Sequence, residues 1–311
     1  LQKPLHISFV FDDVECPCVI EIKGNHYLFG SIREDVKVRY WSASEFRGEY
    51  HAFHNNLLLP QGNYAARVVK DGEHFLIYNF YFAGGNVNSY RVIPPPKQLD
   101  VDDSGRLLLK TYHYWEKLYQ STILQKDLPQ PLPILGNPTA SATIEEKWTL
   151  GCRSGYEIYG FEKPSKDFVW EGKLAVEGMG KTGFVIECDA EGTAYYISID
   201  FVNGFVQFRA WGFNDKDVKN NFIFENIQTN QFDIQEDREI YFKIVRYGNY
   251  YELSINEVVK LTLLDFKYNE GKIGFYVCSA IVSVSDSKIH VLPEPVNEYA
   301  TSDPEKYLNE H

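Results

Sequence analysis

The chain has 311 residues, 44% of them hydrophobic and 24% charged, so it can form one large or two ordinary globular domains. Its formal net charge of −12 opposes contact with a phosphate backbone and argues against a nucleic-acid partner. No apolar run approaches the roughly 20 residues of a membrane-spanning helix, so no membrane partner is expected either.

The chain contains five cysteines at irregular spacing, and such an odd number is not a disulfide framework. The pattern mildly favours a reducing compartment, although both a cytoplasmic and a secreted location stay open. The first residue is Leu1 and not Met, so we expect that the chain was processed or begins partway through a longer protein.

Residues 5–115 predict short β-strands, because β-branched and aromatic residues alternate with Gly, Asn and Asp. Hairpin turns are expected at KGNHY (23–27) and KDGEHF (70–75), where Gly and Asn tolerate positive φ. The unit CVIEIKGNHYLFGS (18–31) is echoed by ARVVKDGEHFLIYN (66–79) about fifty residues later, a period typical of propeller blades.

A proline-marked crossing, VIPPPKQLDV (92–101), leads into a further expected hairpin at DDSG (102–105). Residues 112–127 form the most helix-like segment, although the apolar pattern is weak. The stretch LPQPLPILGNP (128–138) contains four prolines, which predicts a stiff linker and the best domain boundary.

From 139 to 293 the strands become longer and alternate apolar with polar residues, which predicts an antiparallel β-sandwich of two sheets. The tail, 294–311, is polar and acidic and is expected to be a short packed extension or frayed. The predicted fold is therefore all-β, with a propeller portion over 1–127, the linker over 128–138, the sandwich over 139–293 and the tail.

Two motifs suggest chemistry that the sequence context does not favour. AVEGMGKT (175–182) matches a permissive phosphate-loop pattern, but a strand follows at once, so a hairpin at Lys181 and Thr182 is the better interpretation. Cys16 and Cys18 have two histidines nearby, yet one intervening residue is poor spacing for zinc, and thiols acting as small apolar groups are favoured. No metal and no cofactor are expected.

Aromatic residues of the sandwich allow two interpretations. Residues at alternating strand positions usually fill the core, whereas exposed rings can stack on sugars. The core interpretation is favoured for each of them taken singly. The residues in question are Trp170, Tyr195, Tyr196, Trp211, Tyr247, Tyr250 and Tyr251.

Glu15 stands at the head of the run CVIEI, just before Pro17. A solvated, inert acid is the default interpretation of such a residue. The neighbours instead indicate that the chain turns here into the inner strand of a blade. Inner strands of a propeller converge on its channel, where a carboxylate is partly desolvated, as suits a general acid.

The segment VECPCVIEIKGNHYLF (14–29) resembles the Glu-Cys-Pro blade of glycoside hydrolase family 32, the invertase, levanase and inulinase group. Asn63-Tyr64-Ala65-Ala66 and the hairpin after it resemble the next blade of the family. Residues 90–110 resemble its Leu-Pro-Arg-Glu-Leu crossing and Gly-Arg-Leu hairpin. A linker and a sandwich follow in the family's order, and the second half of the sandwich is similar to a concanavalin-type jelly roll.

The resemblance implies a five-bladed propeller and a retaining glycosidase in which Glu15 is the general acid/base. It implies a carbohydrate partner, a fructoside or related glycoside, held by residues around Glu15, namely Cys16, Tyr64, Arg67 and Asn79. The family's Asn-Asp-Pro-Asn and Arg-Asp-Pro motifs do not occur in this chain. Because residues 1–115 provide only about two blades, we expect the nucleophile to come from an N-terminal propeller half, in the same protein or a companion chain.

Several family positions are occupied by other residues. Cys18 stands where the family has Asp, Ala66 and Arg67 replace Pro-Gln, and Tyr78-Asn79 replaces Gly-Trp. The sugar therefore need not be a fructoside. The alternative is a non-catalytic carbohydrate-binding protein that uses the jelly-roll sandwich and a degenerate propeller, with exposed aromatics such as Trp211 as the contact surface.

Overall fold

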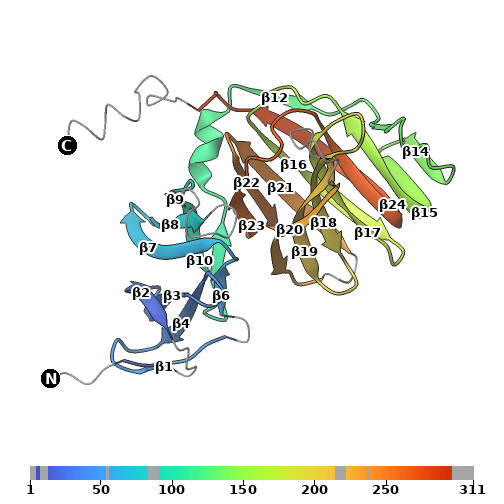
Figure 1. The fold of residues 1–311 in the computed structure, drawn as a ribbon. Helices are drawn as coiled ribbons and strands as arrows, with labels where there is room; N and C mark the ends of the chain where they lie inside the picture. The colour runs from blue at the N-terminus through green and yellow to red at the C-terminus, as the bar shows by residue number, and fades with distance from the viewer. Residues whose placement is uncertain are drawn as a thin grey trace.

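The computed structural model describes residues 5–7, 13–53, 56–82, 91–213, 222–234, 236 and 238–295. Within these ranges the chain is built almost entirely of strands, together with one short 3₁₀ helix, η2 (His113–Leu118). Figure 1 shows the strands up to β10 gathered on one side of the helical segment and the longer strands of the sandwich on the other. The prediction of an all-β fold is confirmed.

The first blade is a four-stranded antiparallel sheet in the order β2-β3-β4-β6. Its first hairpin turns at Lys23 and Gly24, both with positive φ (51° and 82°), as a two-residue type I′ turn requires. A short parallel pair, β1 with β5, lies beside it. The bounds are β1 (His6–Ile7), β2 (Val14–Ile22), β3 (Asn25–Ile32), β4 (Lys37–Ala43), β5 (Glu49–Tyr50) and β6 (Leu57–Leu59).

The second blade repeats this design, since β7 pairs with β8, β8 with β10 and β10 with β11. The expected hairpin at DDSG is present, and the Asp102 carboxylate accepts backbone hydrogen bonds from Ser104 and Arg106 to fix the turn. The bounds are β7 (Asn63–Asp71), β8 (His74–Phe82), β9 (Arg91–Val92), β10 (Lys97–Val101) and β11 (Leu107–Lys110).

The two blades share one apolar core. Tyr27 and Phe29 from the first blade and Ile77 and Leu99 from the second are buried together, at 4% exposure or less. The same cluster includes Val259 from the sandwich, and β11 pairs with the sandwich strand β23 (Val258–Leu264). The blades and the sandwich are therefore packed against each other.

The helix predicted over residues 112–127 is much shorter in the structure. The 3₁₀ helix η2 ends at Leu118, and Tyr119 already has extended backbone angles (φ −62°, ψ 116°). Strand β12 (Ser121–Leu124) then pairs with β24 (Lys272–Val291), which satisfies the backbone groups that a longer helix would have bonded internally. In the proline-rich stretch, β13 (Gln130–Pro131) pairs with β15 (Trp148–Phe161).

The sandwich is organised around its last and longest strand, β24 (Lys272–Val291), which pairs with β12, β15, β16 and β17. The ring of Trp170 is wholly buried and meets Phe184, Phe242 and Phe275 edge-on, with ring centroids 5.0–5.5 Å apart. The other bounds are β14 (Ala140–Ile144), β15 (Trp148–Phe161), β16 (Phe168–Glu177), β17 (Lys181–Cys188), β18 (Ala194–Asp200), β19 (Phe205–Phe213), β20 (Phe222–Gln231), β21 (Glu239–Tyr247) and β22 (Tyr250–Ile255).

The seven aromatic residues of the sandwich considered in the sequence analysis differ in burial. Most of them are buried, which supports the core interpretation, whereas Trp211 and Tyr247 are only half-buried. The hairpin expected at Lys181 and Thr182 is wrong, because β16 and β17 both pair antiparallel with β24 and so run in the same direction, interrupted only at residues 178–180. Lys181 and Thr182 begin strand β17, and Lys181 forms an ion pair with Asp200. The boundaries 1–127, 128–138 and 139–293 stay predictions, and the tail beyond residue 295 lies outside the described residues.

Candidate functional site

Glu15 lies at a β-bulge in the first hairpin. It faces Ser31, but the next aligned pair is Cys18 with Phe29, so Cys16 and Pro17 oppose the single residue Gly30. Cys16 has positive φ (52°), and Pro17 has no N–H to lose from the ladder. A Cβ on Gly30 would come within 2.4 Å of Val14 Cγ1, so glycine is required opposite the bulge. The bulge re-aims the side chain that precedes it, that of Glu15.

Two side chains hold the Glu15 carboxylate. The Tyr64 hydroxyl donates to Oε2 at 2.7 Å, and Arg33 Nη2 lies 2.9 Å from Oε1. Arg33 also reaches Asp13 through Nη1 at 3.2 Å, so one guanidinium bridges two carboxylates. The Glu15 side chain is 33% exposed, which leaves part of the carboxylate open to solvent or to a ligand.

Tyr64 lies at the matching bulge of the second blade. It faces Phe80, the next aligned pair is Arg67 with Tyr78, and Ala65 has positive φ (53°). The pKa of the Tyr64 hydroxyl is raised by burial and by its hydrogen bond to Glu15, so the hydroxyl stays protonated and donates a hydrogen bond to the carboxylate. The two bulges are therefore built alike and face each other.

Further contacts tie the two bulges together. The backbone N–H of Ala65 donates to Ser31 Oγ at 2.8 Å, and Arg67 Nη1 donates to the carbonyl of Cys16 at 2.6 Å. The structure thus brings four of the residues predicted from the resemblance into one place, namely Glu15, Cys16, Tyr64 and Arg67. Cys16 contributes its carbonyl to the contact with Arg67.

Asn79, the remaining predicted substrate-binding residue, is buried at 4% exposure. Its Nδ2 donates to Asn63 Oδ1 at 2.8 Å and to the carbonyl of Phe80. Asn63 in turn donates to the carbonyls of Pro60 and Thr262. Asn79 therefore belongs to a buried amide network that joins the second blade to the sandwich, and its role in substrate binding stays a prediction.

Arg33 and Asp13 were not singled out from the sequence. A signal for Arg33 existed, because Ser31 faces Glu15 across the hairpin and residues two apart on a strand share a face. That inference requires the register of the pair to be known. The bulge shifts this register by one residue, so alternation counted from the hairpin turn leads to the wrong face.

The described residues contain no group of three or more His, Cys, Asp or Glu side chains that could hold a metal ion. All five cysteines are free thiols, and Cys16 and Cys18 are half-buried. His26 lies 3.8 Å from Glu21 and 5.9 Å, ring to ring, from Phe46. Among these residues, no helix is long and apolar enough to cross a membrane.

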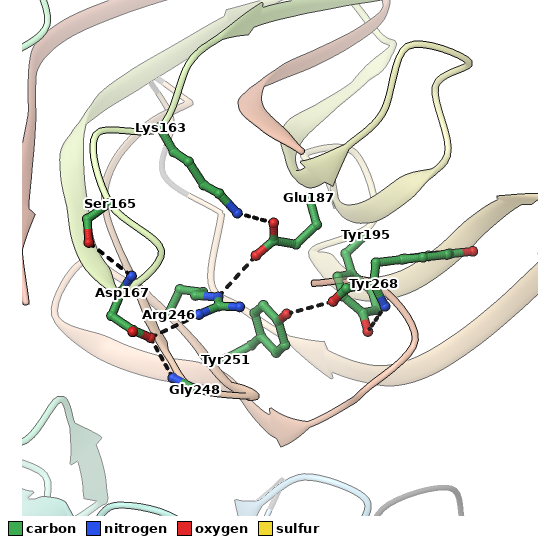
Figure 2. Close-up of polar contacts among 9 residues, drawn as sticks. All are labelled: Lys163, Ser165, Asp167, Glu187, Tyr195, Arg246, Gly248, Tyr251 and Tyr268. Atoms are coloured by element: carbon green, nitrogen blue, oxygen red, sulfur yellow. Dashed lines mark hydrogen bonds and ion pairs between the residues drawn. The ribbon is translucent and has the colours of Figure 1, made fainter. Parts of the chain in front are cut away.

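A second polar cluster lies inside the sandwich (Figure 2). Arg246 Nη1 donates to Asp167 Oδ1 at 2.9 Å and Arg246 Nε to Glu187 Oε1 at 3.1 Å, and Lys163 pairs with the other oxygen of Glu187. The side chains of Arg246, Asp167 and Glu187 are at most 1% exposed. The cluster is closed to solvent, so we interpret it as a structural centre of the sandwich.

A shallow recess lies on the sandwich where β15, β18, β19 and β24 meet. Its walls are Tyr156, Tyr196, Trp211 and Tyr276, with the guanidinium of Arg209 and the hydroxyl of Ser198 among them. Neighbouring ring centroids are 5.5–6.2 Å apart. Aromatic walls around a few polar groups are the usual composition of a small-ligand surface. We call this the aromatic recess.

No protein-family model matches the sequence, and no curated protein is significantly similar to it. Solved structures do match. The fructosyltransferase from A. japonicus has a TM-score of 0.61 at 12% identity, over 92% of this chain and 57% of its own. The exo-inulinase from Aspergillus awamori has a TM-score of 0.59 at 11% identity, over 90% of this chain and 57% of its own.

A GH32 beta-fructofuranosidase from Bombyx mori is similar with a TM-score of 0.52 at 12% identity, over 90% of this chain and 54% of its own. At such identities the likeness concerns the fold alone. The chain therefore has a GH32-like fold, in which propeller blades are followed by a β-sandwich. It spans little more than half the length of each of these structures.

Proposed function

We propose that this chain is the C-terminal half of a retaining glycosidase of the family 32 type, with Glu15 as its general acid/base. The observation that supports this most is the placement of Glu15 at a bulge between two blades, held by Tyr64 and Arg33 and still one-third exposed. The GH32-like fold, with strands continuing into a sandwich, agrees with the proposal.

In the proposed reaction Glu15 gives its proton to the glycosidic oxygen as the bond to the sugar carbon breaks. A carboxylate nucleophile forms the glycosyl–enzyme bond on the opposite face of the sugar. Glu15, now ionised, next takes a proton from water, whose oxygen displaces the nucleophile. Arg33 and Tyr64 contact the two oxygens of the Glu15 carboxyl group and orient it for both proton transfers.

The nucleophile is proposed to lie on further propeller blades, upstream in the same protein or on a companion chain. Two blades cannot close a five-bladed propeller, and the strand edges of an unclosed propeller favour pairing with further strands. The length of the similar structures is compatible with this, because this chain covers 54–57% of each of them. The substrate is proposed to be a fructoside or a related glycoside.

The test compares Glu15→Gln with Glu21→Gln, a control on the same strand whose side chain is 64% exposed. Both are made in the protein isolated with any companion chain. Loss of a general acid removes about 10²–10⁴-fold in rate on sucrose or a fructan, whereas the control keeps its activity. The Glu15→Gln variant should still cleave an aryl fructoside in the first turnover, because that leaving group departs without a proton. The released phenol should therefore appear as a burst.

A retaining mechanism also fixes the anomer that first appears, which NMR of the fresh product reports. Inverted product would contradict the proposed mechanism. Full activity of Glu15→Gln would remove Glu15 from the reaction. An intact protein that turns over no sucrose, fructan or related glycoside would overturn the proposed function.

The aromatic recess supports a second candidate, a non-catalytic sugar-binding protein. Three half-buried rings, those of Tyr156, Trp211 and Tyr276, surround Arg209 in one shallow depression, whereas Tyr196 lies buried beneath them. Trp211 also meets Phe224 edge-on at 5.2 Å, and Phe224 is 60% exposed, so the aromatic surface continues outward from the recess. Such a surface can bind the end of a sugar chain without any catalytic carboxylate.

A glycan array separates the two candidates. Binding without turnover, abolished by Trp211→Ala and kept by the control Phe205→Ala on the same strand, would favour the binding protein. Phe205 is a suitable control because it is 36% exposed at the other end of β19. Absence of binding to any glycan would dismiss this candidate.

A further inference from the structure

The hairpins β2–β3 and β7–β8 are repeats with a constant offset of 49 residues. In the first hairpin Cys18 faces Phe29, and in the second hairpin Arg67 faces Tyr78. Adding the offset to a residue number of the first hairpin therefore gives its counterpart in the second. Each face of one blade can thus be compared with the same face of the other blade.

One face of the first blade packs against the second blade, and we call it the forward face. It carries Cys18, Ile20, Phe29 and Ser31, which share a side because they lie two apart on a strand or opposite each other in a pair. Phe29 is 1% exposed and belongs to the same apolar core as Ile77 of the second blade. Ser31 is wholly buried and accepts a backbone hydrogen bond from the second blade. The forward face of the first blade is therefore an interface between blades.

The forward face of the second blade is exposed. The four counterparts are Arg67, Val69, Tyr78 and Phe80, and we call them the open face. Val69 is 52% exposed, Phe80 40% and Tyr78 38%, and Arg67 is exposed as well, whereas none of the matching residues of the first blade is exposed. Large apolar side chains gathered on one face of a sheet mark a contact surface.

The back face of the first blade, on the other side of its sheet, is already covered by its own chain. Leu28 and Trp41 lie there, and Trp41 is wholly buried. Tyr50 of β5 and Ile7 of β1 complete this apolar cluster. A second copy of this chain would therefore offer no free back face, because that of its first blade is covered and that of its second blade packs against the first.

The back face of the second blade shows what kind of surface covers a forward face. It is apolar and mostly aliphatic, and it includes Ala66, Val68, Ile77 and Leu99. A further blade with a back face of this composition would cover the open face by repeating a contact that the chain already makes once. Stacked sheets lie about 10 Å apart with their side chains interdigitated, so the fit needs no change of either backbone.

We propose that the open face is the docking surface of a further antiparallel blade, which lies upstream in the same protein and presents an aliphatic back face to Val69, Tyr78 and Phe80. The repeat supports the geometry of this contact. The similar structures support its source, because the part equivalent to this chain takes up only 54–57% of each of those longer chains. The inference rests on the further blades of the proposed function, but not on catalysis by Glu15.

The open face continues to the Glu15 site. Arg67, at one end of the open face, donates to the carbonyl of Cys16 at 2.6 Å, and Cys16 directly follows Glu15 in the chain. A blade seated on the open face therefore borders the Glu15 site and can contribute residues to it.

Hydroxyl-radical footprinting of the protein isolated from its natural source tests the proposal. Mass spectrometry reports the oxidation rate of each side chain, and Phe80 is compared with Phe205, which is 36% exposed on the sandwich. A free open face would give the two phenylalanines similar rates. Docking would lower the exposed fraction of Phe80 from 40% to the 4% or less found in the core shared by the blades, so its rate should fall roughly tenfold relative to Phe205. Val69 should likewise react more slowly than Val202, which is 41% exposed.

Matched variants of the same full-length protein test the contact itself. Val69→Asp places an unpaired carboxylate inside the proposed interface, where its burial is unfavourable. The urea midpoint should therefore fall, and Phe80 should become as reactive as Phe205. Val202→Asp introduces the same charge on the sandwich and should change neither property. The second blade itself should tolerate Val69→Asp, because this side chain is 52% exposed in the chain described here.

Three results would overturn the inference. One is equal reactivity of Phe80 and Phe205 in the natural protein. Another is protection of Phe80 in an assembly whose subunits have only the mass of this chain, which would make a second copy the partner. The last is protection by a separate polypeptide that denaturation releases, which would contradict an upstream source. Protection of Phe80 by an upstream segment in a protein that hydrolyses no glycoside would uphold the docking surface and overturn only the proposed function.

Discussion

Glu15 and Tyr64 occupy equivalent positions of two repeated hairpins, 49 residues apart in the chain, and their side chains meet in a 2.7 Å hydrogen bond. Each residue comes directly before a bulge whose first residue has positive φ, Cys16 in one hairpin and Ala65 in the other. The repeat thus places an acid in one blade and a matching donor in the next. The proposed active site depends on this pairing.

Tyr64→Phe tests the contact directly. The substitution keeps the ring, which packs 5.6 Å from Phe82, and removes only the hydroxyl that donates to Glu15. A hydrogen bond to a charged group contributes about 1.5–3 kcal/mol, so kcat/KM of the intact protein is expected to fall roughly 10- to 100-fold. Tyr78→Phe, at an exposed hydroxyl on β8, serves as the control. Equal activity of Tyr64→Phe and the unaltered protein would refute the contribution of this bond.

Arg33→Met tests the bridge between the two carboxylates. The Arg33 side chain is 69% exposed, so its ion pairs with Asp13 and Glu15 should stabilise the fold by no more than about 1 kcal/mol. Activity should nevertheless fall, because Glu15 loses the partner that orients it. Arg33→Lys keeps the positive charge, but its single nitrogen cannot contact both carboxylates as the two guanidinium nitrogens do. Its activity should therefore lie between those of Arg33→Met and the unaltered protein. Urea unfolding and kcat/KM, measured on the same samples, separate the two effects, and a large loss of stability would contradict this account.

Much of the fold could be predicted from the sequence because turns are local. The Gly-containing turns after Ile22 and Asp71 fixed two hairpins, and their spacing indicated two blades. Pro17 and the apolar run after it indicated an inner strand beginning near Glu15, but not the bulge that carries this residue. The resemblance implied that Tyr64 binds substrate, but its hydrogen bond to Glu15 was not predicted, since nothing local to either residue indicates it.

Other features depend on contacts that are distant in the sequence. Residues 121–124 appeared helical in isolation, yet they form β12, because the edge of β24 offers hydrogen bonds to them. The partners of Asn79 and Trp115 are likewise set by packing between blade and sandwich. Arg33 was missed because a bulge changes which strand residues share a face.

Glu171 predicts how stability depends on pH. Burial alone raises its pKa, but hydrogen bonds and charge from Lys288, Tyr241 and Lys243 outweigh burial and lower the pKa to about 2. Its pKa in the folded chain is about 2 against an ordinary value of 4.5, so the folded state holds this carboxylate ionised more strongly than the unfolded state does. The resulting stability, on the order of 3 kcal/mol, is present above about pH 4.5 and is lost as pH falls toward 2. Glu171→Gln should therefore be less stable than the unaltered chain at pH 7, and the gap should narrow at pH 3. Thermal unfolding at both pH values measures this, with the exposed Glu177→Gln as control, and a gap that widens in acid would contradict the assignment.

Removing one charge from the buried cluster of Figure 2 should destabilise the fold more than removing one charge from a surface ion pair. Arg246→Met leaves Asp167 and Glu187 without their central cation in a site closed to solvent, which typically costs about 3–5 kcal/mol. Lys181→Met breaks the pair with Asp200, in which Lys181 is 44% exposed, and should cost less than about 1 kcal/mol. Removing the opposing charge as well, in Arg246→Met with Glu187→Gln, should recover part of the loss, because fewer buried charges remain unpaired. Urea unfolding of Arg246→Met, of Glu187→Gln and of the double variant gives the coupling energy between Arg246 and Glu187. Strictly additive losses would mean that the two residues act independently, contrary to the 3.1 Å contact between them.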